Sequence, residues 1–120
     1  MNLNTPRRGE IYLADLDPVE GHEQSGQRPF LVLSVRAMNE APWRLAIGVP
    51  TTTTDRGGVM HVRLEPTESG LDRVTYALPE MVRSVSAARF RKLLGRAPVE
   101  CVNLTARRTG VLLGLGRTRH

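Results

Sequence analysis

The sequence predicts a mostly β domain with helical additions, and three observations lead to this fold class. Five short segments rich in β-branched and other apolar residues follow one another between residues 11 and 78, separated by polar stretches with Gly or Pro. After residue 86 the apolar residues change to helical spacing. The connections are short, which favours antiparallel neighbours. Together these features indicate a small twisted barrel or sheet capped by helices, in one domain of 120 residues.

The first two expected strands enclose a polar segment. Residues 11–16 alternate enough for a strand, and an Asp-Pro pair ends the run. Residues 19–28 are polar and contain two glycines, so we expect a loop there. Residues 30–35 are nearly all apolar, as expected for a strand that is buried on both faces. Pro29 would fix the start of this strand.

Three more strands are expected before residue 80. Residues 45–49 are apolar and would form the third strand, which ends at Pro50. Residues 55–58 read Asp-Arg-Gly-Gly, a composition typical of a hairpin turn that leads into the next strand. That fourth strand covers residues 61–64, where alternation predicts a half-exposed position, and the fifth covers residues 74–78.

Two helices complete the predicted fold. Residues 86–94 carry apolar side chains at helical spacing, with Ser86 as a plausible N-cap and Gly95 at the end. Pro98 suits the first turn of a second helix. We expect one face of this second helix to be shared by Val99, Val102, Ala106 and Leu113. Cys101 would take a half-buried position there, with a structural role.

The charge points to an anionic partner. Seventeen basic against twelve acidic residues give a net charge of +5, and the sequence pI is about 10.6. Such an imbalance attracts polyanions. Sixteen of the basic residues are arginine, whose planar fork fits phosphate and can stack on bases. This favours RNA or DNA, although a codon bias of the source genome explains the arginine preference equally well.

Several classes of protein and site are not expected. The longest stretch without a charged residue covers residues 45–54, well short of the roughly 18 apolar residues that span a bilayer. Because the N-terminus has no apolar signal-type stretch, we expect a cytoplasmic location. A single cysteine excludes an internal disulfide and a cysteine-pair zinc site. His22, His61 and His120 lack metal-ligand spacing, so we expect no metal or other cofactor.

Three polar segments could carry chemistry. Residues 21–29 form a polar loop between two strong strand signals, residues 50–52 gather hydroxyls at a strand end, and residues 80–84 form a charged patch. Each also has a purely structural interpretation, as a solvated loop, a β-favouring threonine run and a surface ion pair. From these pieces alone the sequence indicates a basic β-rich module that binds nucleic acid.

The order of these motifs is more specific than any one of them. Residues 8–18 read Arg-Gly-Glu-Ile-Tyr-Leu-Ala-Asp-Leu-Asp-Pro, and residues 21–29 read Gly-His-Glu-Gln-Ser-Gly-Gln-Arg-Pro. Val-Pro-Thr-Thr follows at residues 49–52, and Val-Arg-Ser-Val at residues 82–85. In this combination the chain closely resembles the MazF/PemK family of toxin endoribonucleases, over roughly residues 7–115.

The resemblance implies a fold, an activity and partners. It implies an SH3-like β-barrel with helical additions, working as a homodimer that cleaves single-stranded RNA, including messenger RNA, at short sequence motifs without metal. It also implies a cognate antitoxin whose acidic, extended tail covers the RNA groove. An acidic peptide that competes for a basic groove agrees with the net charge of +5.

Residue by residue, the resemblance places the family's catalytic arginine on Arg28 and its catalytic threonine on Thr52, with Thr51 as an alternative one residue earlier. His22 is a candidate general base because it titrates near neutrality, but a solvated loop residue explains it as well. The remaining expected site residues are Glu23 and Gln24, which shape the site, and the RNA contacts Gln27, Thr53, Arg56, Glu80 and Arg83. Met81 departs from the glutamine of many relatives, so we do not transfer a cleavage motif.

Two rival functions differ in class. A non-catalytic inhibitor on the same fold, similar to the gyrase-poisoning toxin CcdB, would bind a protein through a Trp-Gly-Ile tail. This sequence ends Gly-Arg-Thr-Arg-His, and its only tryptophan, Trp43, is expected in a mid-chain loop. A plain RNA-binding barrel without turnover is the other rival. The sequence therefore favours the nuclease over the gyrase inhibitor.

Overall fold

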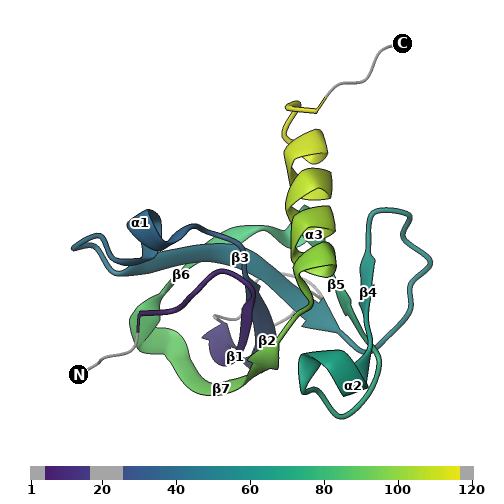
Figure 1. The fold of residues 1–120 in the computed structure, drawn as a ribbon, viewed down its shortest axis with the longest axis horizontal. Helices are drawn as coiled ribbons and strands as arrows, with labels where there is room; N and C mark the ends of the chain where they lie inside the picture. The colour runs from purple at the N-terminus through teal and green to yellow at the C-terminus, as the bar shows by residue number, and fades with distance from the viewer. Residues whose placement is uncertain (1–4, 17–25, 117–120) are drawn as a thin grey trace.

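A curled sheet with one long helix packed against it forms the molecule (Figure 1). The computed structural model describes residues 5–16 and 26–116. The strands are β1 (Glu10–Leu16), β2 (Gly26–Val32), β3 (Leu45–Thr52), β4 (Val62–Leu64), β5 (Thr75–Ala77), β6 (Arg83–Ser86) and β7 (Phe90–Arg96). The helices are α1 (Arg36–Asn39), α2 (Pro66–Ser69) and α3 (Val99–Leu112), with 3-10 turns η1 (Pro79–Met81) and η2 (Ala87–Arg89). The mostly β fold class is therefore confirmed.

All strand pairs in the described part of the chain are antiparallel, as the short connections predict. The order is β4-β5-β3-β2-β1-β7, and β6 adds to β3. β3 changes partner along its length, because residues 45–48 pair with β6 and residues 51–52 pair with β5. This exchange, with the bulges where β1 meets β7, bends the sheet into a half-barrel.

Glycine is required where β3 crosses β2. A Cβ atom at Gly48 would lie 2.0 Å from the carbonyl oxygen of Leu31 and 2.8 Å from the Phe30 ring. No side chain fits at these distances, so Gly48 allows the close approach of the two strands.

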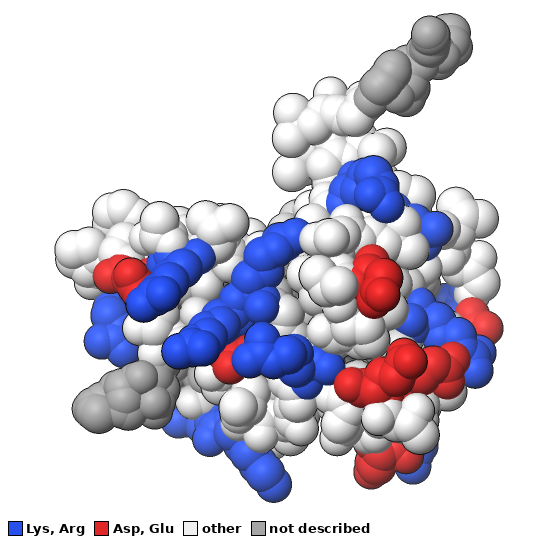
Figure 2. Space-filling model, viewed as in Figure 1, with Lys and Arg blue, Asp and Glu red and all other residues white. Residues whose placement is uncertain are grey.

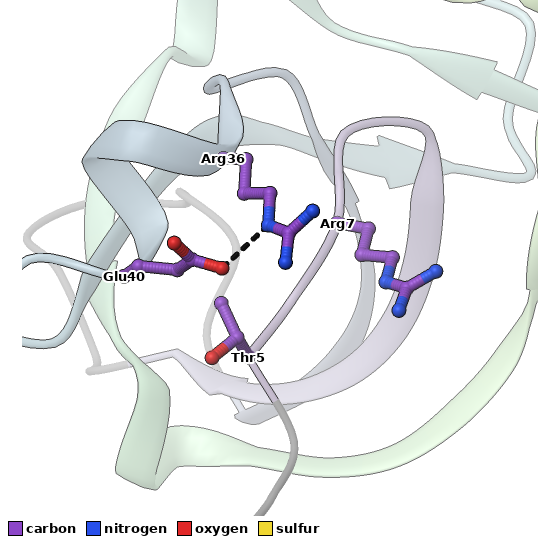
Figure 3. Close-up of a pocket in the computed structure, with 4 residues that line it drawn as sticks. All are labelled: Thr5, Arg7, Arg36 and Glu40. Carbon is purple, nitrogen blue, oxygen red and sulfur yellow. Dashed lines mark hydrogen bonds and ion pairs between the residues drawn. The ribbon is translucent and has the colours of Figure 1, made fainter.

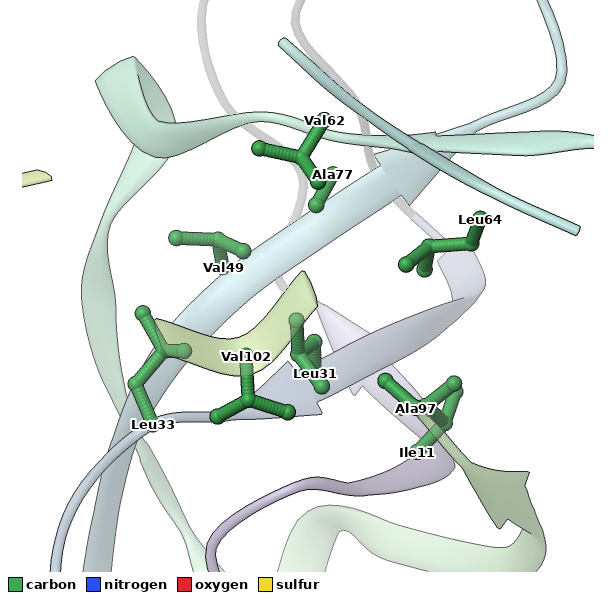
Figure 4. Packing of buried hydrophobic residues seen from close by; sticks show 9 residues of the cluster. All are labelled: Ile11, Leu31, Leu33, Val49, Val62, Leu64, Ala77, Ala97 and Val102. Carbon is green, nitrogen blue, oxygen red and sulfur yellow. The ribbon is translucent and has the colours of Figure 1, made fainter. Parts of the chain in front are cut away.

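Two apolar clusters cover the two faces of the sheet. The larger lies under α3 (Figure 4) and contains Ile11, Leu31, Leu33, Val49, Val62, Leu64, Ala77, Ala97 and Val102. The other lies inside the curl and contains Ala14, Leu16, Phe30, Val32, Ala46 and Val85, with Tyr12 and Phe90 packed against it. β2 supplies Leu31 to the first cluster and Phe30 and Val32 to the second. The prediction of burial on both faces is thus confirmed for residues 30–33 but not for Val35, which is 58% exposed.

The two central strands extend beyond the predicted prolines. β2 begins at Gly26, so residues 26–28 belong to a strand rather than a loop, and Pro29 lies inside it. β3 continues to Thr52 with Pro50 inside, where the Pro50 carbonyl accepts the amide of Leu78 at 3.1 Å. A proline can thus take part as an acceptor although it has no N–H to donate. Residues 33–35 leave the strand and lead into α1.

Two other predictions were wrong because long-range pairing overrides local pattern. Residues 86–94 are not a helix: Ser86 caps only the short turn η2, and residues 90–96 form β7 against β1. The Phe90 ring stacks on Tyr12 with centroids 4.9 Å apart, which favours the strand. Residues 55–58 do not close a hairpin either, because β4 pairs with β5 and not with β3.

The second helix forms as predicted, but with a different buried face. α3 begins at Val99 after Pro98, and its buried residues are Val102, Thr105 and Thr109. Val99 and Leu113 are each 65% exposed, so these two do not belong to that face. Cys101 is half-buried on α3, and burial, followed by the charge of Glu68, raises the pKa of its thiol. Among the described helices, none has the length and apolar character to cross a membrane.

Candidate active site

The two predicted catalytic residues lie at the same end of β2 and β3, which we call the open end because the pairing of the two strands stops before it. The backbone pairing of β2 with β3 ends at Phe30 and Pro50, two residues away from Arg28 and Thr52. The Thr51 hydroxyl then donates to the Pro29 carbonyl at 3.1 Å, which continues the alignment by one step. Beyond the β2–β3 pairing, Thr52 pairs with Tyr76 of β5. Arg28 and Thr52 therefore both lie just past the paired residues, at the same end of β2 and β3.

The two threonines differ in what their hydroxyls do. Thr51 is 0% exposed, and its hydroxyl proton is used in the bond to the Pro29 carbonyl. Thr52 is 5% exposed, and its Oγ1 accepts the amide of Thr54 at 3.1 Å. A hydroxyl that accepts a hydrogen bond still has its own proton to donate. Thr52 is therefore better suited than Thr51 to bind an anion.

Arg28 lies half-buried on β2, with Ala14 of β1 beside it. Within residues 5–16 and 26–116, no carboxylate forms an ion pair with its guanidinium. A guanidinium can hold two oxygens of a phosphate through parallel hydrogen bonds. Together with a neighbouring hydroxyl, it can stabilise negative charge that develops on a phosphodiester.

Gln27 belongs to a polar network that crosses three strands, which the sequence did not predict. It is exposed on β2 opposite Asp15 of β1, and Arg91 of β7 donates from Nε to the Asp15 carboxylate at 2.6 Å. The Arg91 hydrogen bond, and to a smaller degree that from Gln27, lower the pKa of Asp15 against the opposing effect of desolvation. Asp15 and Arg91 are 76 residues apart, so no local signal could have found this contact.

Thr53 and Arg56 are exposed in the segment that leaves β3. Asp55 orders this segment: one carboxylate oxygen accepts the amide of Gly57 at 2.9 Å, and the other accepts the Tyr76 hydroxyl at 3.4 Å. The backbone of Gly57 has φ of 70°, which favours glycine. The two predicted RNA contacts thus lie in a segment fastened to β5, directly after Thr52.

Glu80 and Arg83 take different places. Glu80 is exposed on η1, whereas Arg83 lies on β6 opposite Gly48. Gly48 is four residues before Thr52 on β3, a separation of about 13 Å at the usual rise per residue. Arg83 therefore lies farther along the sheet than the Arg28–Thr52 pair.

His61 is the partner of Glu80, a contact that no local motif indicates because 19 residues separate the two. Its Nε2 lies 2.8 Å from the Glu80 carboxylate, while its Nδ1 is buried without a hydrogen-bond partner. The Gly58 backbone packs on the imidazole, because a Cβ there would lie 2.7–2.9 Å from three ring atoms. Arg108 of α3 donates to the His61 carbonyl at 2.8 Å. His61 thus joins the segment after β3 to η1 and α3.

Two further sets of predictions remain, the three loop residues of the expected site and the expectation of no metal. His22, Glu23 and Gln24 lie outside the described residues. In the described ranges, no group of three or more His, Cys, Asp or Glu side chains is arranged to hold a metal ion.

Comparison with known proteins places this arrangement in a family. Two curated relatives are Endoribonuclease MazF9 of Mycobacterium tuberculosis, 36% identical over 95 residues, and Endoribonuclease MazF of Staphylococcus saprophyticus, 32% identical over 89 residues. The first alignment covers 75% of this chain and 80% of the relative, and the second covers 73% and 74%.

Solved structures agree in fold over nearly the whole chain. MazF of Deinococcus radiodurans has a TM-score of 0.80 and 30% identity, covering 93% of this chain and 99% of its own. A MazE–MazF complex of the same organism gives a TM-score of 0.76 and 32% identity, covering 94% and 99%. The family model that matches residues 7–111 is described as a PemK-like, MazF-like toxin of a type II toxin–antitoxin system, and the chain belongs to this family.

Proposed function

We propose that this protein is a toxin endoribonuclease that cleaves single-stranded RNA without metal, and that a cognate antitoxin neutralises it. The observation that carries the proposal is that Arg28 on β2 and Thr52 on β3 both lie at the open end, just past the paired residues of the two strands. The relatives of this chain are named endoribonucleases, and one of the similar structures is a MazE–MazF complex.

The proposed reaction uses the substrate as its own nucleophile. The ribose 2′-oxygen attacks the adjacent phosphorus, and the bond to the 5′-oxygen of the next nucleotide breaks. The products are a 2′,3′-cyclic phosphate and a 5′-hydroxyl, with the 2′ proton lost to a base and one proton delivered to the leaving oxygen. Because nucleophile and phosphorus belong to one molecule, proximity is already supplied. The protein mainly has to stabilise the charged intermediate and move protons.

Arg28 and Thr52 would supply that stabilisation. The guanidinium pairs with the non-bridging oxygens as negative charge accumulates, and the free Thr52 proton donates to the same phosphate. Arginine is a poor base because its pKa exceeds about 12, so the proton acceptor is another group. His22 stays a candidate for that role.

Partners follow from charge and from exposed apolar residues. The net charge of +5 suits both RNA and an antitoxin with an acidic extended tail. Four apolar residues at and beyond the end of α3 are 41–70% exposed, and neighbouring exposed apolar side chains of this kind mark interaction surfaces: Val111, Leu112, Leu113 and Leu115. We assign this surface to a second copy of the chain. Leu113→Glu should then yield a monomer in light scattering, where the unchanged chain is a dimer.

The decisive experiment is incubation of the purified protein with a long RNA in EDTA. New 5′-hydroxyl ends and 2′,3′-cyclic phosphates are expected, and sequencing of the ends gives the base preference. RNA binding without new ends would reduce the protein to a binding module. Loss of cleavage in EDTA alone would overturn the metal-free mechanism.

A further inference from the structure

A second basic region lies away from the Arg28–Thr52 pair. Figure 2 shows a band of Lys and Arg side chains that crosses the face of the molecule, with most of the acidic side chains to its right. Four arginines line two hollows and come from three segments: Arg7 and Arg8 precede β1, Arg36 begins α1 and Arg96 ends β7. We call these four residues the N-terminal arginine cluster.

The backbone fixes the N-terminal arginine cluster firmly. The amide of Gly9 donates to the Val32 carbonyl at 2.8 Å, and its carbonyl accepts the amide of Ala97 at 2.9 Å. Arg8 donates to the Leu33 carbonyl at 2.5 Å and to Asn103 of α3 at 3.0 Å. The chain before β1 is thus held against β2, β7 and α3, and the arginines on it have fixed positions.

Two neighbouring hollows open among these arginines. One is a notch of about 180 Å³ lined by Thr5, Arg7, Arg36 and Glu40, in which Arg36 reaches toward Glu40 while the Arg7 side chain points away from that pair (Figure 3). The other is lined by Arg8 and Arg96 together with Gly9, Ala97, Val99 and Val102. Neither lining contains an aromatic side chain on which a base could stack. The notch beside Arg7 and Arg36 is suited to a phosphate group rather than a base, while the second hollow is mostly apolar apart from Arg8 and Arg96.

The carboxylates nearby leave the cluster positive. Glu40 is paired with Arg36 at 2.5 Å. Glu10 is 7% exposed, and its oxygens accept the Arg7 amide at 2.8 Å and the Tyr12 hydroxyl at 2.9 Å, with Arg96 at 3.4 Å. The cluster therefore has four guanidinium groups and only two carboxylates, and one of these, Glu10, is buried.

The cluster is separate from the proposed active site. Arg28 faces Ala14 near one end of β1, while Glu10 faces Arg96 at the other end. Four residues of strand separate Ala14 from Glu10, about 13 Å, and Arg7 lies beyond. A ligand that reaches both places must be a chain of several nucleotides.

We propose that the N-terminal arginine cluster binds the sugar–phosphate backbone of the RNA strand beyond the cleaved position. This inference rests on the proposed nuclease function. Since the contacts are made to phosphates, the cluster raises affinity for longer substrates irrespective of their sequence, and it takes no part in the chemical step.

The test compares charge variants on substrates of two lengths. Arg7→Gln/Arg36→Gln removes two exposed charges, and Arg73→Gln/Arg107→Gln removes two exposed charges elsewhere as a matched control. Each phosphate contact of a single strand contributes about 0.7 to the slope of log affinity against log salt. At 0.1 M salt, two lost contacts correspond to a roughly 25-fold higher KM for a long RNA and a slope smaller by about 1.4. A short oligonucleotide that holds only the cleavage motif should keep its KM and kcat.

Removal of a negative charge from the notch should change KM in the opposite direction. Glu40→Gln removes the exposed carboxylate of the notch, so it should lower KM for the long RNA and leave the short oligonucleotide unaffected. Equal KM for long RNA in the Arg7/Arg36 variant and the control would overturn the inference, as would weaker antitoxin binding with unchanged RNA affinity. Failure of the unchanged protein to cleave either substrate would instead overturn the proposed function.

Discussion

The two ends of the β1–β2 pair carry arginines in different surroundings. At the open end, Arg28 lies just past the paired residues of β2 and β3, as Thr52 does, and it forms no ion pair with a carboxylate among the described residues. At the other end, Arg96 lies beside Glu10, which also accepts the Tyr12 hydroxyl and the Arg7 amide. An arginine without a carboxylate partner is suited to meet negative charge that develops during a reaction, and among residues 5–16 and 26–116 Arg28 has none. An arginine held in a carboxylate network is better suited to binding and stability.

The largest expected effect is a loss of kcat on substitution of Arg28 at the open end. Arg28→Gln should lower kcat about 100- to 1000-fold, because loss of one pre-positioned donor raises the barrier by about 2.7–4 kcal/mol. Cleavage of a short oligonucleotide under saturating conditions measures it. Arg73→Gln, which removes an exposed charge elsewhere, is the control and should keep kcat. An Arg28→Gln variant with unchanged kcat would place the chemistry elsewhere.

The next effect separates the two threonines at the same end. Thr52→Val should lower kcat about 100-fold through loss of one donor to the phosphate. Thr51→Val should instead lower the free energy of unfolding by about 1–2 kcal/mol, because the Pro29 carbonyl loses its donor. Single-turnover kinetics and urea unfolding of both variants provide the comparison. The reverse pattern would assign the catalytic hydroxyl to Thr51.

The opposite end should respond to alkaline pH. Burial, followed by the hydrogen bond to Glu10, raises the pKa of Tyr12 to about 12. The unfolded value is about 10, so the folded state keeps this proton more tightly, and the resulting stability is present below pH 10 and lost as pH rises to about 12. Tyr12→Phe should therefore show a smaller fall in unfolding free energy than the unchanged protein between about pH 9.5 and 11. The explanation would be contradicted if the unfolding free energy of Tyr12→Phe and of the unchanged protein fell equally over this pH range.

The smallest expected effect is on stability at acid pH and involves the Asp15–Arg91 ion pair near the open end. The Arg91 hydrogen bond lowers the pKa of Asp15 below its unfolded value of about 3.9. The folded state therefore loses this proton more readily, and the contribution is present above about pH 4 and lost at lower pH. Asp15→Asn and Arg91→Gln should each flatten the dependence of unfolding free energy on pH between about 2 and 4. If only one of the two variants did so, the ion pair would not be the cause.

Local pattern was sufficient for the elements whose burial follows their own sequence. The apolar run of β2 and the Pro98 start of α3 needed no knowledge of neighbours, and the ordered motifs over residues 8–29 were enough to indicate the family. Local pattern failed for residues 86–94, where helical spacing predicts a helix but residues 90–96 form strand β7. Pairing with β1 and stacking of Phe90 on Tyr12 outweigh the weak local preference for a helix.

The sequence by itself determined the mostly β class, the excess of arginine and the identity of Arg28 and Thr52 as candidates. Only the tertiary structure decided which residues meet. The ends of β2 and β3 bring Arg28 and Thr52 to one end of the sheet, and the fold brings Glu80 to His61 and Asp15 to Arg91. Backbone hydrogen bonds of Gly9 to Val32 and Ala97 hold the arginines before β1 near Arg96. The physical reason is that composition and periodicity report on neighbours along the chain, whereas strand order and curvature set the contacts between distant residues.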